Sequence, residues 1–326
     1  MKYFLIVFLF SLSINSTLKA QSNEDSLGVK KDTIKYQIYK ISETENYQYR
    51  KLKISDLYKT IPKNILNTAK DMVSKEVYPY SIAAVGATAA LVPVDPFLTR
   101  NARSFGKQIG FEYDHSYRHQ FAPANVNTAL YFMGNGTAVV LMGVGFASYG
   151  FIAKDYRAQS VSAQLVQSII VSGVFSQTLK RITGRESPFI TTQEGRENSS
   201  WHFFPSFAAY QKDTSRYDAV PSGHLTTGLA AWTVIAENYP EYKWIRPVGY
   251  TVLGLMCFEM VQSGVHWTSD YPIAILFGYL IGKNIAKSAI KKETTTNLSD
   301  YRTKYKLNFS SSSLGGIQTF GVNVVF

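Results

Sequence analysis

The chain has 326 residues, with 34 Lys and Arg against 23 Asp and Glu, which gives a formal net charge of +11. Its 45% hydrophobic and 14% aromatic content is enough to bury a core, so disorder is not expected. The mean hydropathy of -0.08 is low for a polytopic protein that is fully buried in lipid. The one cysteine, Cys257, excludes an intramolecular disulfide and is expected to fill the core.

The N-terminus has the pattern of a secretory signal peptide. Met1 and Lys2 precede an apolar run over residues 3–12, and Ala20 provides a small residue for cleavage. Residues 1–20 are therefore predicted to be removed on export to the cell envelope, where the protein is periplasmic or membrane-associated; a retained anchor is the alternative. A basic exported protein suits anionic headgroups or phosphorylated substrates, and nucleic acid is not an expected partner.

The remaining chain divides into three parts by composition. Residues 21–70 form a polar N-terminal segment with one peripheral helix near Leu57 to Ile65. Residues 71–290 form a helical bundle, and residues 291–326 form a C-terminal tail. In the tail, apolar residues alternate around residues 305–309 and again over 320–326, with a turn predicted at Ser310 to Gly316, so a small β-hairpin is expected.

Within residues 71–290, mainly apolar stretches mark the expected helices, and the first four of them contain no Lys, Arg, Asp or Glu. They cover residues 77–94, 122–153, 158–179, 222–236, 245–261 and 267–289. Residues 95–121 are predicted to be a connection of mixed charge, and residues 180–218 a long polar loop. The 122–153 block could cross a bilayer, whereas the glutamines of 158–179 favour burial in protein.

Three clusters of polar residues lie at the ends of these helices. They are Lys180 to Pro188, Pro221 to His224, and Gly264 to Asp270. Ser222 is typical of a helix N-cap, and a helix start also exposes N–H groups that bind phosphate. His266 and Asp270 are four residues apart, so on a helix they would share a face, either as a structural pair or as an oriented nucleophile.

In order and spacing, these clusters resemble the three-part signature of the type-2 phosphatidic acid phosphatase/haloperoxidase superfamily, over about residues 77–290. The resemblance implies an all-α, six-helix bundle in which Lys180, Ser222 and Gly223 bind phosphate. It further implies that His266 is the nucleophile, that Asp270 orients it and that His224 protonates the leaving group. The resemblance requires neither a metal nor a cofactor.

Two family arginines are replaced in this chain, by Ser187 and by Met260. Both would have provided bidentate phosphate donors. Arg185 is therefore predicted to bind phosphate in their place, with Arg181 as a weaker candidate. The alternative for Arg185 is an exposed loop residue paired with Glu186.

The sequence thus predicts a phosphomonoesterase of the cell envelope that hydrolyses lipid phosphates or related compounds through a phosphohistidine. Two alternatives are a non-catalytic protein that binds phosphorylated headgroups and a vanadate-dependent haloperoxidase. A cleaved signal followed by six spans would place the clusters on the cytoplasmic side. We therefore expect either that residues 77–94 do not cross the membrane or that the bundle has few or no spans; a retained anchor also removes the conflict.

Overall fold

The computed structural model describes residues 35–111, 123, 125–294, 306–314 and 317–325, with backbone only for the last two ranges. The predicted signal peptide lies outside these residues. The described helices before the long loop are α1 (Ile61–Met72), α2 (Tyr78–Leu91), α3 (Asp95–Gln108), α4 (Val126–Met133), α5 (Gly136–Ile152) and α6 (Tyr156–Thr183). Those in or after it are α7 (Pro188–Gln193), α8 (Phe207–Lys212), α9 (Gly223–Asn238), α10 (Ile245–Gln262) and α11 (Tyr271–Ala289).

The chain is mainly helical, as predicted, but the exact count of six helices is not confirmed. Local chain breakers produce additional short helices. Pro93 and Pro96 flank the junction of α2 and α3, and Gly134 with Asn135 divides the predicted 122–153 helix into α4 and α5, which are bent by 74°. The expected connection at residues 95–121 was wrong in its first half, which forms α3.

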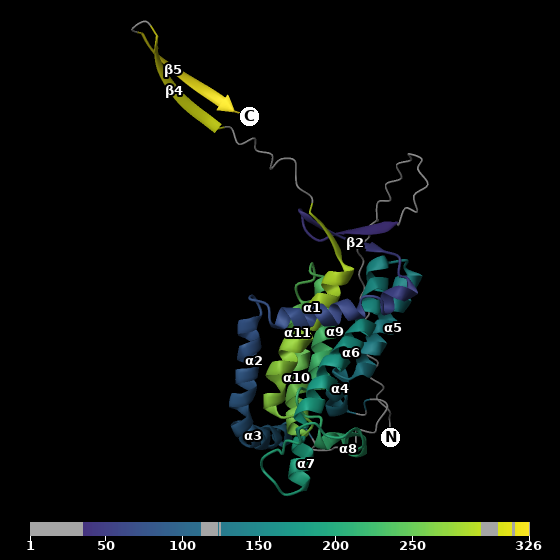
Figure 1. Ribbon diagram of the computed structural model, residues 1–326. Helices are drawn as coiled ribbons and strands as arrows, with labels where there is room; N and C mark the ends of the chain where they lie inside the picture. Colours follow the sequence, from purple (N-terminus) through teal and green to yellow (C-terminus); the bar gives the residue numbers. More distant parts are fainter. Residues whose placement is uncertain (1–34, 112–122, 124, 295–305, 315–316, 326) are drawn as a thin grey trace.

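Helix α9 lies inside the bundle, packed against α6, α10 and α11 (Figure 1). Small residues let α11 approach α9 closely. A Cβ atom at Gly278 would lie 2.8 Å from the Thr226 carbonyl oxygen, and one at Gly282 would lie 2.5 Å from that of Ala230. The contact buries aliphatic side chains such as Val234 and Ile281, so the first turn of α9 is held on a rigid support.

A three-stranded antiparallel sheet covers one end of the bundle, and the sequence did not indicate it. The strands are β1 (Tyr36–Lys40), β2 (Glu45–Arg50) and β3 (Lys291–Thr294), in the order β1-β2-β3. Tyr47 is paired with Tyr39 on one side and Lys292 on the other. The Tyr49 hydroxyl donates to Asn238 at 3.0 Å, which attaches the sheet to the end of α9.

The tail contains the predicted hairpin. Strand β4 (Lys306–Leu314) pairs antiparallel with β5 (Ile317–Val325). The turn was predicted at Ser310 to Gly316, but residues 310–314 belong to β4 and not to a turn.

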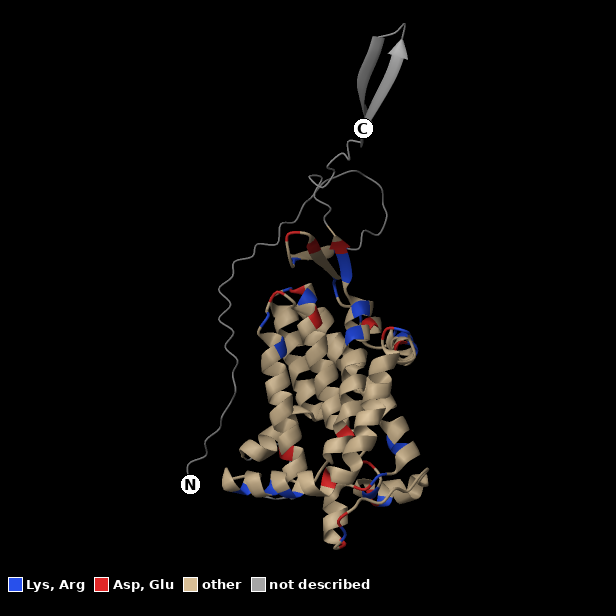
Figure 2. Cartoon of the chain, turned by 90° about the vertical axis from the view of Figure 1, so that its left-hand side faces the viewer, with Lys and Arg blue, Asp and Glu red and all other residues tan. Residues whose placement is uncertain are grey.

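Charged side chains are concentrated toward the two ends of the bundle, and the length between is largely uncharged (Figure 2). Two described helices are long and apolar enough to cross a membrane. These are Tyr78–Gln108, which includes α2 and α3, and Tyr156–Thr183. The 18-residue apolar windows within them are 22% and 61% buried in the protein, respectively. The bent pair α4 and α5 would make a third. The glutamine-rich α6 is thus largely enclosed by protein, as its composition indicated.

Candidate active site

The N-cap and first turn of α9 contain the second cluster, and His224 in this turn lines the cavity described below. Ser222 is the N-cap and accepts a hydrogen bond from the Leu225 N–H at 3.3 Å, which confirms the predicted helix start. The Ser222 N–H donates to the Asp270 carbonyl at 3.1 Å, so the second and third clusters are joined through the backbone. The start of a helix offers N–H groups and a positive dipole end to an anion.

Lys180 reaches this helix start from the last turn of α6. Its side chain is buried, with 6% of its surface exposed. A Cβ atom at Gly223 would lie 3.5 Å from Lys180 Nζ, so the absence of a side chain at Gly223 keeps the ammonium group close to the helix start. The structure therefore brings Lys180, Ser222 and Gly223 together, as the resemblance implied.

His266 and Asp270 are in contact, but not on one α-helix as expected. Trp267 caps a short 3-10 helix, η5 (Thr268–Asp270), and His266 precedes it. Asp270 Oδ2 lies 3.3 Å from His266 Nδ1 and accepts the Trp267 N–H at 2.8 Å. The tight turn brings the two side chains together in place of helical periodicity. Because Nδ1 faces the carboxylate, Nε2 is the ring nitrogen left for chemistry.

His266 and His224 border a common cavity of about 70 Å³. Their ring centroids are 5.9 Å apart, and the Tyr131 ring lies 4.7 Å from that of His224. The cavity is lined by Tyr131, Lys180, Ser187, Ser215, Asp218, His224, Val265 and His266. Residues from all three clusters therefore converge on one small polar cavity.

Arg185 is not among the residues that line this cavity, contrary to its predicted phosphate contact. Gly184 ends α6 in a left-handed conformation (φ 53°) and turns the chain so that Arg185 enters the protein, with 1% of its surface exposed. Its guanidinium donates to Asp270 Oδ1 at 2.6 Å and to Asp95 Oδ2 at 2.7 Å. It also donates to Ser269 Oγ at 2.6 Å and to Ser199 Oγ at 3.1 Å, and none of these four acceptors lines the cavity.

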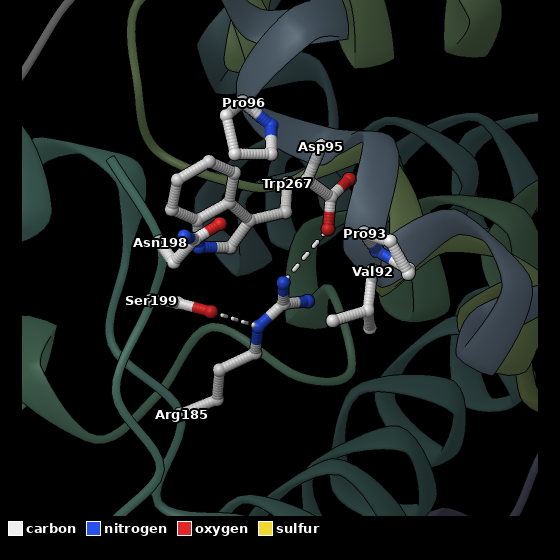
Figure 3. A pocket seen from close by; sticks show the side chains of 8 residues that line it. All are labelled: Val92, Pro93, Asp95, Pro96, Arg185, Asn198, Ser199 and Trp267. Atoms are coloured by element: carbon white, nitrogen blue, oxygen red, sulfur yellow. Dashed lines mark hydrogen bonds and ion pairs between the residues drawn. The ribbon is translucent and has the colours of Figure 1, made fainter.

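Asp95, the first residue of α3, was not predicted as a site residue. Its carboxylate is buried and accepts the Ser269 N–H at 3.0 Å in addition to the Arg185 guanidinium. Figure 3 shows the Arg185 and Asp95 side chains facing each other beside Trp267, at a second cavity of about 170 Å³. The Asp95–Pro96 pair is a typical helix start, and this was the only signal that the sequence offered.

The positions of the two family arginines differ in their surroundings. Ser187 lines the cavity, is buried, and its hydroxyl has no hydrogen-bond partner. Met260 is fully buried in an apolar cluster with Leu225 and Met256. Arg181 does not replace either of them, because its guanidinium lies over the Tyr210 ring at 3.7 Å.

Glu186 lies at the centre of a charged cluster in the segment between α6 and α9. Arg216 Nη1 and His202 Nε2 each lie 3.0 Å from Glu186 Oε1, and Arg196 pairs with the other oxygen. Burial raises the pKa of Glu186, but hydrogen bonds from His202, Arg196 and the Ser200 N–H outweigh it and leave the pKa below its ordinary value. The alternative pairing of Arg185 with Glu186 is therefore replaced by this separate cluster.

Comparison with known proteins agrees with the three clusters. The family model described as the PAP2 superfamily matches residues 162–292, a range that contains all three, and confirms the predicted resemblance. The lipid A 1-phosphatase of Rhizobium johnstonii is 27% identical over 149 residues, covering 44% of this chain and 56% of the relative. The lipid A 1-phosphatase of Porphyromonas gingivalis is 29% identical over 79 residues, covering 24% and 18%.

The aligned part of the chain thus spans little more than half of the first relative and less than a fifth of the second. Among solved structures, a transmembrane PAP2 type phosphatidylglycerolphosphate phosphatase from Bacillus subtilis is similar, with 15% identity and a TM-score of 0.33. That similarity covers 72% of this chain and 94% of the other.

Proposed function

We propose that the chain is a phosphomonoesterase acting on lipid phosphates or related compounds, supported by the match of the PAP2 superfamily model to residues 162–292. The observation that carries the proposal is the pairing of His266 with Asp270 at a cavity that also contains His224 and Lys180. The name of the relatives, lipid A 1-phosphatase, supports a lipid phosphate as the substrate.

In the proposed reaction, the substrate phosphate occupies the start of α9, bound by its N–H groups, by Lys180 and by the free hydroxyl of Ser187. His266 Nε2 attacks phosphorus, so that an N–P bond forms while the ester P–O bond breaks. His224 donates its proton to the departing oxygen. Water then attacks phosphorus and gives a proton back to His224, and the release of phosphate restores His266.

Asp270 holds His266 in the tautomer that leaves Nε2 free, and it stabilises the positive charge that develops on the ring. We assign Arg185 and Asp95 to the positioning of Asp270, since their contacts fix the carboxylate oxygen that His266 does not use. Arg185 thus acts through Asp270 and not on the phosphate itself.

Membrane association is part of the proposal. Exposed apolar side chains on α2 and α5 cover the uncharged length of the bundle; among them, Val85 is 59% and Leu141 is 65% exposed. A lipid bilayer would remove these surfaces from water at the level where charges are few. Extraction of membranes with carbonate separates embedded from peripheral protein. Export to the cell envelope is tested by a tag near residue 200, which should not face the cytoplasm.

The experiment is turnover by the purified full chain on a panel of phosphomonoesters, with and without acyl chains. We expect released phosphate from the wild type, none from His266→Ala, and ³²P label trapped on His266. Label retained by His266→Ala would refute the nucleophile. The replacement of two family arginines by Ser187 and Met260 favours one alternative, a protein that binds phosphorylated headgroups without turnover; wild-type binding with no released phosphate would establish it.

A further inference from the structure

The active-site cavity contains a carboxylate as well as an ammonium group. Asp218 lines it together with Lys180, and the Asp218 side chain is 30% exposed, so it is accessible from the cavity. Lys180 Nζ and Asp218 Oδ2 are 3.6 Å apart, which is longer than an ordinary hydrogen bond. Each group therefore keeps capacity for a ligand.

The backbone holds Asp218 in this place. Residue 218 forms a parallel β-bridge with Arg185, and the Ala219 N–H donates to the Arg185 carbonyl at 3.0 Å. The carboxylate is thus carried by the segment that connects the first cluster to the second. It is part of the rigid surroundings of the cavity and not a feature of the loop surface.

The charges that border the cavity nearly cancel. Apart from the two histidines, the charged residues among the described lining are Lys180 and Asp218, and the two family arginine positions are neutral as Ser187 and Met260. A phosphate dianion gains from Lys180 but is repelled by Asp218. A ligand that carries a cationic amine beside its phosphate satisfies both groups.

We propose, on the basis of the phosphatase function above, that this site selects phosphomonoesters that bear an ammonium group a short spacer away from the phosphate. Lys180 and the start of α9 bind the phosphate, and Asp218 accepts hydrogen bonds from the ammonium group. Asp218 is then a specificity-determining residue. The same pairing disfavours substrates whose only charge is the phosphate.

A matched pair of ligands tests this. O-phosphoethanolamine and propyl phosphate differ in the replacement of an ammonium by a methyl group. Their dissociation constants are measured calorimetrically on the full chain in detergent, in a His266→Ala background that prevents turnover. The otherwise wild-type site is compared with Asp218→Asn and with Asp213→Asn, a matched change at a carboxylate on the loop surface that pairs with Arg216.

The otherwise wild-type site should bind O-phosphoethanolamine at least about tenfold more tightly, since a charge-assisted hydrogen bond is worth that much. Asp218→Asn should weaken this ligand and strengthen propyl phosphate, while Asp213→Asn changes neither. Equal binding of the two ligands by the otherwise wild-type site, or a change in the same direction for both in Asp218→Asn, overturns the inference. Turnover is scored separately with His266 intact: selective binding without released phosphate would refute only the phosphatase function.

Discussion

The two carboxylate oxygens of Asp270 have separate partners: Arg185 binds Oδ1 at 2.6 Å, and His266 approaches Oδ2 to 3.3 Å. Asp270 is fully buried and Arg185 is 1% exposed, so water does not compete for these contacts. The Trp267 N–H also donates to Oδ2. The carboxylate is therefore fixed in orientation before any substrate arrives, which is the property that an imidazole nucleophile requires of its partner.

Replacing Arg185 by Ala should lower both stability and kcat. The change leaves Asp95 and Asp270 buried without their shared cation, and the loss of one partner of a buried pair typically costs about 3–5 kcal/mol. We expect a large fall in melting temperature and a fall in kcat on the order of a hundredfold with little change in KM. Arg100→Ala removes an exposed arginine paired with Glu197 and is the control; it should change neither.

A double variant distinguishes the two roles considered for Arg185, phosphate binding and the positioning of Asp270. If Arg185 bound phosphate, as the sequence suggested, adding an arginine at Ser187 would recover part of the lost activity of Arg185→Ala. Because Ser187 lines the cavity and Arg185 lies behind Asp270, we expect no recovery in the double variant. A clear gain in kcat/KM on adding Ser187→Arg would contradict the positioning role.

Replacing His224 by Ala should affect substrates according to their leaving groups. An alkoxide needs a proton as it departs, whereas a nitrophenolate does not. We expect a fall of about a hundredfold or more in kcat for alkyl phosphates and a small one for p-nitrophenyl phosphate. Equal losses on both substrates would show that His224 does not act as the acid.

Replacing Gly223 by Ala should weaken phosphate binding without harming the fold. The added methyl group would lie 3.5 Å from Lys180 Nζ, an ordinary contact distance, but it would occupy space beside the ammonium group. We expect KM to rise about tenfold, with an unchanged or slightly higher melting temperature because alanine favours the helix. Gly254→Ala is the control, since a Cβ atom there meets no atom within 4 Å. An unchanged KM for Gly223→Ala would contradict phosphate binding at the start of α9.

The segment between α6 and α9 that Glu186 holds should loosen in acid. The pKa of Glu186 is lowered in the folded state, so its contribution to stability is present above the ordinary carboxyl pKa of about 4.3 and is lost as pH falls through the lower folded value. The difference in melting temperature between the wild type and Glu186→Gln should be large at neutral pH and should shrink below about pH 4. A difference independent of pH would exclude this linkage.

The sequence predicted the parts of the site that local patterns determine. Ser222 as an N-cap and the contact of His266 with Asp270 follow from residues a few positions apart. The contact of Arg185 with Asp95 could not be predicted from local patterns, because Asp95 lies 90 residues earlier in the chain. Nearness to Ser187 in sequence pointed Arg185 toward phosphate, while the left-handed turn at Gly184 directed it into the protein.

The fold was likewise predicted where local sequence patterns determine it and missed where they do not. Long, mainly apolar stretches predicted α2, α6, α9, α10 and α11 to within a few residues, since burial in a bundle or bilayer requires them. Helix α3 was missed because exposed charged residues such as Arg100 and Lys107 give this segment the composition expected of a connection. The β1-β2-β3 sheet was missed because β3 is a short charged segment that becomes a strand only beside β2.

The pairing of β2 with β3 also sets a waiting time during synthesis. Gln48 and Glu293, which form a hydrogen bond across these strands, are 245 positions apart. At about 5–20 residues per second, roughly 12 to 50 s pass between the emergence of one strand and that of the other. During that interval one edge of β2 has no partner strand and is open to other newly made chains until β3 has been synthesised.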